Sequence, residues 1–353
     1  MGTSNIQTYH QSTSNQNTVK LRELLKTMPS FCRDYFRGIE PTTSSRTRIA
    51  YAYDLKIFFH FLQEKYPDIE ESDLKNWPVT VLDKVTLTQL EEYLDYLRLY
   101  EDAENKVHTN EERGRMRKTA SIRTFYKFFY RKQVIKNNTA SLLNLPKKHE
   151  HTIVRLEIDE IAKLLDAVEE GDNLTKSQKK YHNKTKIRDL AILTLLLGTG
   201  IRVSECVGID ISNLDFETNG MKIHRKGGAD VILYFGEEVR EALLDYLEER
   251  EKIIPKEGSE NALFLSMQKR RISVRAVENL VKKYARPVTP LKTITPHKLR
   301  STYGTQLYQE TGDIYLVADV LGHKDVNTTR KHYAAMEDQR RRMAAGKIQL
   351  REK

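Results

Sequence analysis

Residues 187–205 read IRDLAILTLLLGTGIRVSE, and this stretch decides the fold of the C-terminal half. Its first part is mostly apolar, which predicts a helix over 187–197 that lies in a domain core. The two glycines that follow break this helix, and a new helix can begin just beyond them. There Arg202 and Glu205 are i,i+3 neighbours, so the carboxylate can hold the guanidinium in place. For this piece alone, an ordinary surface ion pair is the alternative interpretation.

Four more segments of the C-terminal half place reactive side chains at turns or helix ends. Lys226 lies at the tip of a predicted hairpin. His297 and Arg300 lie one turn apart at a predicted helix N-terminus, which is a natural anion site. His323 follows a glycine that ends a helix, and Tyr333 lies on a predicted short helix. Each feature alone has an ordinary alternative: a solvated turn, an incidental histidine or a packing tyrosine.

Together these residue types suit phosphodiester transesterification. Attack on a phosphodiester builds negative charge on the non-bridging oxygens, which two guanidiniums can bind. A tyrosine hydroxyl, whose ordinary pKa is about 10, must lose its proton, and a neighbouring histidine can accept it. The departing 5′ oxygen leaves more easily when an acid such as a lysine protonates it. The sequence has neither clustered carboxylates for Mg²⁺ nor a Walker-type loop, so we expect no metal and no cofactor.

At these residues the sequence resembles the tyrosine recombinases, the phage integrase and Xer family, in five motifs: 199–205, 225–228, 295–300, 321–323 and 332–333. The motifs follow the order of the family over nearly half of the chain. The resemblance implies a site-specific DNA recombinase that cleaves and rejoins duplex DNA through a 3′-phosphotyrosine. The covalent link stores the energy of the phosphodiester, so religation needs no nucleotide cofactor.

The resemblance also implies a role for each matching residue. Six side chains would form the catalytic set: Arg202, Lys226, His297, Arg300, His323 and Tyr333. The two arginines would bind the scissile phosphate, the lysine would protonate the 5′ oxygen, and the tyrosine would form the covalent link. His297 would be the acid/base partner of the tyrosine, and His323 would hydrogen-bond the phosphate. Glu205 would orient Arg202.

Composition describes a basic globular chain without a membrane span. The 353 residues carry a net charge of +10 and a pI of about 9.3, with 39% hydrophobic and 31% charged residues. Two cysteines exclude a disulfide framework, and the polar N-terminus lacks a signal core, so we expect a cytoplasmic protein. Residues 64–104 hold 12 acids and 4 bases, whereas residues 105–136 hold 10 bases and 2 acids. This contrast suggests one face for a polyanion, with a solvated helix face as the alternative.

The expected fold class is mostly α, in two domains. The resemblance implies a small all-α core-binding (SAM-like) domain over 29–145 and a larger, mainly α catalytic domain with a small β-sheet over 156–338. Residues 146–155 are expected to form the linker between them. Residues 1–28 are expected to be a flexible segment. Residues 339–353 are expected to be a basic tail that, by the resemblance, packs against a neighbouring protomer; a disordered basic tail is the alternative.

Local patterns give further expectations. A polar connection is expected over 101–118, followed by a helix over 119–134 whose aromatic residues belong to the core. A polar loop is expected over 170–186, and a hairpin over 221–225 and 230–235. The basic residues of the smaller domain are candidates for phosphate contact. Eight candidates stand out: Arg46, Arg48, Arg113, Arg115, Arg117, Lys118, Arg123 and Lys127.

The resemblance implies partners and leaves the biological role open. It implies duplex DNA with an inverted-repeat target, a homo-tetramer on two DNA sites with a dimer on each, and possibly a DNA translocase. The length of the chain is most like that of the longer Gram-positive Xer-type enzymes that act alone, which favours resolution of chromosome dimers. The alternatives are an integrase or excisionase of a mobile element, a catalytically silent DNA-binding relative, and a type IB topoisomerase.

Overall fold

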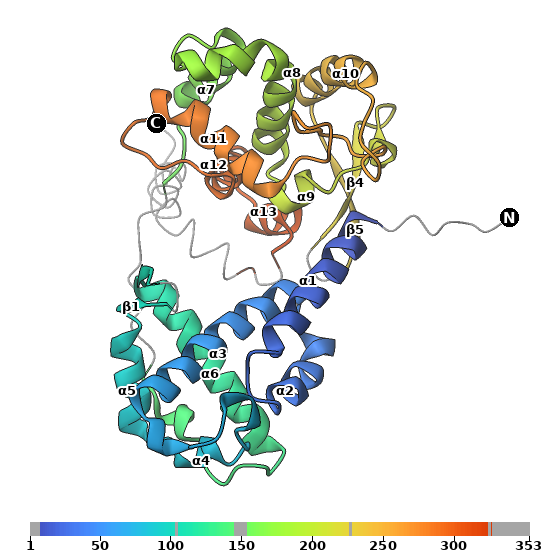
Figure 1. Cartoon of the computed structure of the whole chain (residues 1–353). Coiled ribbons are helices and arrows are strands. Elements are labelled where there is room, and N and C mark those ends of the chain that lie inside the picture. The colour runs from blue at the N-terminus through green and yellow to red at the C-terminus, as the bar shows by residue number, and fades with distance from the viewer. Residues whose placement is uncertain (1–7, 103–104, 145–153, 226–227, 324–325, 327–353) are drawn as a thin grey trace, which may run out of the picture. The chain divides into compact units, whose positions relative to one another are not determined.

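The computed structural model describes residues 8–102, 105–144, 154–225, 228–323 and 326 (Figure 1). The chain divides into two compact units, residues 1–150 and 151–353. Helices dominate both units, and each contains a small antiparallel sheet. No helix among the described residues is both long and apolar enough to cross a membrane.

The first unit is a bundle of helices with one β-hairpin. Its helices are α1 (Tyr9–Leu25), α2 (Cys32–Gly38), α3 (Ser45–Lys65), α4 (Val81–Lys84), α5 (Leu87–Tyr96) and α6 (Glu112–Arg131). Strands β1 (Leu99–Glu101) and β2 (Val107–Thr109) form the hairpin between α5 and α6. Ser44 caps α3 with its hydroxyl, and Thr86 forms a capping box with Gln89 at the start of α5. Such caps satisfy amide groups that the first helical turn leaves free.

Aromatic side chains form the core of the first unit. The rings of Tyr35 and Phe125 lie 4.9 Å apart between centroids, and those of Phe58 and Tyr93 lie 5.2 Å apart, both pairs edge to face. Trp77 is the largest of the fully buried side chains. The prediction that the aromatic face of α6 belongs to the core is confirmed for Ile122, Phe125 and Phe129, which are buried, and is wrong for Tyr130, which is 49% exposed.

Two expectations for the first unit are wrong. Residues 8–28 are not a flexible segment: α1 packs on α3, and Leu21, Leu25 and Met28 join the core. The polar connection over 101–118 instead holds the hairpin β1–β2, and α6 begins at Glu112. In α1 the buried apolar side chains offset the loss of chain entropy on ordering a polar segment. The described residues of 101–118 bury no apolar side chain; there the strand pairing, the stacking of Tyr100 on His108 and the hydrogen bond from Lys118 to Asn110 hold the segment.

The second unit surrounds one long helix. Its helices are α7 (Ile158–Glu170), α8 (Lys176–Thr199), α9 (Val203–Cys206), α10 (Glu237–Glu251), α11 (Val274–Val288), α12 (Pro296–Thr311) and α13 (Ile314–Leu321). Strands β3 (Leu214–Asp215), β4 (Gly220–His224) and β5 (Asp230–Tyr234) form an antiparallel sheet in the order β3-β4-β5, which confirms the predicted hairpin.

Helix α8 places the decisive stretch in the core of the second unit. Its C-terminal half is buried among α7, α10 and α12, as the apolar pattern predicts. The expected loop over 170–186 is wrong, because α8 begins at Lys176, where Thr175 and Gln178 form a capping box. Gly200 ends the helix with a φ of +61°, and a Cβ there would collide with the ring of Tyr303.

Candidate active site

The predicted site converges on the turn that ends α13. Gly322 follows the helix with a left-handed φ of +60°. Its amide donates to the carbonyl of Asp319 at 2.8 Å, and the amide of His323 donates to that of Ala318 at 2.9 Å. The carbonyls of residues 319–322 also accept hydrogen bonds from arginine side chains of three other segments. A helix C-terminus carries partial negative charge, so guanidiniums stabilise it.

Arg202 is the first of these arginines, and Glu205 holds it. The guanidinium Nη1 donates to Glu205 Oε1 at 2.7 Å, and the Arg202 amide donates to Oε2 at 2.8 Å. Nη2 donates to the Gly322 carbonyl at 3.1 Å. The Glu205 side chain is only 4% exposed, whereas that of Arg202 keeps 31% exposure. The predicted i,i+3 pair is confirmed, and it fixes a partly accessible guanidinium against the turn.

Arg300 reaches the same turn from α12. Its Nη1 donates to the Gly200 carbonyl at 2.6 Å, and its Nη2 donates to the Leu321 carbonyl. Arg300 is buried. The helix begins at Pro296, which confirms the predicted helix N-terminus, and His297 lies exposed on its first turn. Since Arg202 and Arg300 donate to consecutive carbonyls, the structure brings the two predicted phosphate-binding guanidiniums together.

Arg225 is a third arginine that the sequence analysis did not single out. Its Nη1 donates to the Asp319 carbonyl at 3.1 Å, and its Nη2 donates to the Val320 carbonyl at 2.6 Å. Burial lowers the pKa of Arg225, and the neighbouring Arg202 lowers it further. The only sequence signal was its place directly before Lys226. By these bonds Arg225 ties the end of the hairpin strand to the turn.

The structure therefore places part of the predicted set. Arg202, Arg300, Glu205 and the backbone of His323 meet at the end of α13. His297 lies one helical turn before Arg300 in α12. Two predicted catalytic residues, Lys226 and Tyr333, lie outside the described residues, as does the tail over 339–353.

Comparison with known proteins identifies the family. Residues 154–340 match the phage integrase family. The chain is 33% identical over 328 residues to tyrosine recombinase XerC of Caldanaerobacter subterraneus, and the match covers 90% of this chain and 85% of that protein. The chain belongs to the phage integrase family of tyrosine recombinases. It is also 28% identical to tyrosine recombinase XerD of Oceanobacillus iheyensis, over 84% of this chain and 90% of that one. The enzyme is thus a tyrosine-type site-specific recombinase.

Solved structures of other recombinases have the same fold. XerH recombinase, in a post-cleavage complex with a palindromic difH substrate, matches 86% of this chain and 80% of its own with a TM-score of 0.62 and 18% identity. A lambda integrase dimer bound to a COC′ core site matches 86% of this chain and 94% of its own with a TM-score of 0.59 and 17% identity. The predicted fold class, mostly α in two domains with a small sheet, is confirmed.

The candidate phosphate contacts of the first unit fall into distinct groups. Arg48 and Lys118 were predicted as contacts, but both are buried and serve the fold of the recombinase. Arg48 pairs with Glu40 at 2.5 Å, and Lys118 donates to Asn110 Oδ1 at 2.7 Å. Burial lowers the pKa of Lys118. The exposed candidates are Arg46, Arg113, Arg117 and Lys127, and the half-buried ones are Arg115 and Arg123.

Arg117 also has a structural partner. Its guanidinium pairs with Asp54, whose side chain is 1% exposed. Burial raises the pKa of Asp54, although Arg117 and Lys118 oppose the shift. Among the residues that the structure describes, no group of three or more His, Cys, Asp and Glu side chains could hold a metal ion.

Proposed function

We propose that this recombinase cleaves and rejoins duplex DNA through a 3′-phosphotyrosine on Tyr333. One observation carries the proposal: Arg202 and Arg300 donate to the consecutive carbonyls of Gly322 and Leu321, directly before His323. Two guanidiniums anchored side by side provide donors for the non-bridging oxygens of one phosphodiester. Because Glu205 and the helix carbonyls already hold them, little reorganisation is needed when the phosphate binds.

In the proposed reaction, the hydroxyl oxygen of Tyr333 attacks the phosphorus and the bond from phosphorus to the 5′ oxygen breaks. The proton of the tyrosine passes to His297, and Lys226 gives a proton to the departing 5′ oxygen. Arg202 and Arg300 bind the negative charge that develops on the phosphate. Religation is the reverse: the 5′ hydroxyl attacks the phosphotyrosine, and the tyrosine leaves with its proton restored. No atom or electron is required from outside the protein and DNA.

The substrate that we propose is duplex DNA with an inverted-repeat site, bound by two copies per site and four copies on two sites, in the cytoplasm. The relatives named XerC and XerD favour resolution of chromosome dimers as the biological role, with a DNA translocase as a possible partner. Integration or excision of a mobile element is the second candidate. It is favoured by the likeness to an integrase of a transposon in complex with circular intermediate DNA, at a TM-score of 0.59.

The experiment uses nicked duplexes of randomised sequence, because a nick next to the cleavage position traps the covalent complex. The full chain is incubated with the pool, and complexes that resist SDS are isolated and their DNA sequenced. We expect covalent complexes with the wild type and none with Tyr333→Phe. Tyr315→Phe, at an exposed tyrosine on α13, is the matched control and should behave as the wild type. Undiminished adduct with Tyr333→Phe would refute the assignment.

A further inference from the structure

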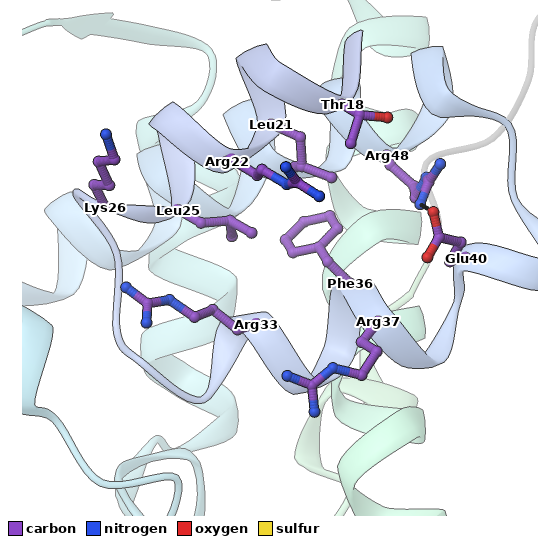
Figure 2. A pocket seen from close by; sticks show the side chains of 10 residues that line it. All are labelled: Thr18, Leu21, Arg22, Leu25, Lys26, Arg33, Phe36, Arg37, Glu40 and Arg48. Carbon is purple, nitrogen blue, oxygen red and sulfur yellow. Dashed lines mark hydrogen bonds and ion pairs between the residues drawn. The ribbon is translucent and has the colours of Figure 1, made fainter. Parts of the chain in front are cut away.

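A basic cavity of about 470 Å³ lies on the first unit, far in sequence from the active site. Figure 2 shows how its lining residues come from α1, α2, the segment between α2 and α3, and the first turn of α3. The floor is apolar, since Leu21, Leu25 and Phe36 line the cavity and belong to the core. A pocket of this size with an apolar floor suits one or two aliphatic side chains.

Cations surround this floor. Arg22, Lys26, Arg33 and Arg37 are exposed around the cavity, and Glu40 is the one acidic residue among the described residues that line it. Glu40 is already paired with Arg48, and the hydrogen bond and charge of that arginine lower the pKa of Glu40. The cavity therefore presents an excess of positive charge around an apolar floor, which selects an acidic partner with an apolar anchor.

The hairpin β1–β2 of the same unit has the complementary character. Its inner face carries Tyr100 and His108, whose rings stack at 5.2 Å between centroids. The outer face carries Leu99 and Val107, which are 62% and 56% exposed, beside Glu101. Two exposed aliphatic side chains next to a carboxylate form a small apolar protrusion.

We propose that the outer face of hairpin β1–β2 in one copy of this chain docks in the basic cavity of a second copy. The aliphatic pair would lie on the apolar floor, and Glu101 would face the guanidiniums of Arg22 and Arg33. Figure 1 places β1 and α2 on opposite sides of the first unit, so the hairpin of one copy cannot reach the cavity of the same copy. The contact is head to tail, and such contacts can close into rings.

Duplex DNA is the other polyanion that could meet these cations. A concave site with an apolar floor fits the hairpin better, because a DNA backbone is charged along its whole length and offers no aliphatic group to the floor. This contact would be one interface of the DNA-bound assembly proposed above, and so it rests on the proposed function. Its test does not use cleavage, so failure of the contact and failure of the proposed chemistry are distinguishable.

The test joins two copies of the full chain through cysteines. Thr18→Cys labels the cavity and Thr109→Cys labels the outer face of the hairpin, and both changes leave the proposed cations and anchors intact. The native Cys32 and Cys206 are buried, and burial raises the pKa of Cys206 to about 12, so they should stay unreactive. A short bismaleimide is added to each variant alone and to the mixture.

We expect a crosslinked dimer in the mixture and little in either variant alone. A mixture of Thr18→Cys with Ile254→Cys, at a residue 82% exposed in the second unit, measures chance collisions. Adding Leu99→Ala to the hairpin variant should lower the yield about tenfold, because loss of a central apolar anchor commonly weakens an interface by that factor. Arg33→Glu should lower the yield too, and Glu101→Arg in the other copy should restore it.

Three results would overturn the proposal. The first is a yield in the Thr18→Cys and Thr109→Cys mixture no higher than in the control. The second is dimer formation by Thr18→Cys alone, which would mean that two cavities face each other. The third is a yield that Arg33→Glu and Leu99→Ala both leave unchanged, with circular dichroism showing that the variants are folded. If Arg33→Glu instead weakens binding to random duplex DNA without any crosslink, the cavity is a DNA surface.

Discussion

Gly322→Ala tests the arrangement at the end of α13 most directly. The residue has a φ of +60°, which an alanine adopts only with strain. A Cβ at this position would also meet the guanidinium of Arg225 well inside contact distance. The guanidinium can move aside, but it then loses its hydrogen bonds to the carbonyls of Asp319 and Val320. The substitution therefore combines a backbone penalty with the loss of a side-chain contact.

The two contributions can be separated with a second glycine. Gly258 in the same unit has a φ of +78°, and a Cβ there would meet no atom within 4 Å. Gly258→Ala should destabilise the second unit by the backbone strain alone, about 1–2 kcal/mol. For Gly322→Ala, we add about 1–2 kcal/mol for two charge-assisted hydrogen bonds at a half-exposed arginine. The expected total is about 2–4 kcal/mol.

Urea unfolding of the full chain measures both values. Trp77 is the only tryptophan, and it is buried in the first unit, so its fluorescence follows that unit. Far-UV circular dichroism follows both units, and the transition that fluorescence does not report belongs to the second. Both variants should leave the fluorescence midpoint in place. Equal destabilisation by Gly322→Ala and Gly258→Ala would refute the reasoning, because Arg225 would then contribute nothing at the turn.

Three further variants test neighbouring contacts. Glu205→Gln keeps the shape of the side chain but removes the charge that holds Arg202; we expect covalent complex formation to fall about 10–100-fold, with binding in gel shifts nearly unchanged. Arg225→Ala should destabilise the second unit by about 1–2 kcal/mol in urea. Burial alone would raise the pKa of Glu160, but hydrogen bonds from Lys292 and the backbone outweigh it and hold this pKa below 4.5. Above pH 4.5 the wild type should therefore have a higher free energy of unfolding than Glu160→Gln. This difference should vanish as the pH falls through the pKa that Glu160 has in the folded protein, and urea unfolding at about pH 7 and at about pH 3 measures it.

Sequence predicted the parts of the site that local signals determine. Pro296 begins α12, Gly322 ends α13, and the i,i+3 pair at the start of α9 has the expected ion pair. These features depend on residues within one helical turn, so periodicity and caps reveal them. The bonds from Arg225 to α13 join residues 94 and 95 positions apart, and no local pattern carries that information.

Two of the helices that the sequence analysis did not predict, α1 and α8 before residue 187, share one overlooked signal. Because of their polar composition, residues 1–28 were predicted to be flexible and residues 170–186 to form a loop. Each segment nevertheless contains a Thr-x-x-Gln capping box, at Thr8 and at Thr175. The same signal at Thr86 precedes α5, where the buried Leu90 and Tyr93 mark an apolar face that makes the helix easy to recognise. In α1 the polar residues hide a few apolar positions that are buried, so average composition is a poor guide to order there.

The end of α13 is informative because its charges do not balance. Three guanidiniums approach four backbone carbonyls, while Glu205 pairs with Arg202 and the charges of Glu205 and Asp319 both act on Arg225. Carbonyl dipoles offset only part of the repulsion between the cations, so the turn keeps an excess of positive charge. An anion bound there would relieve that repulsion, and a phosphodiester carries one negative charge with two free oxygens to share. The contacts that stabilise the helix end therefore also prepare the proposed phosphate site, which is why a stability variant such as Gly322→Ala should affect cleavage.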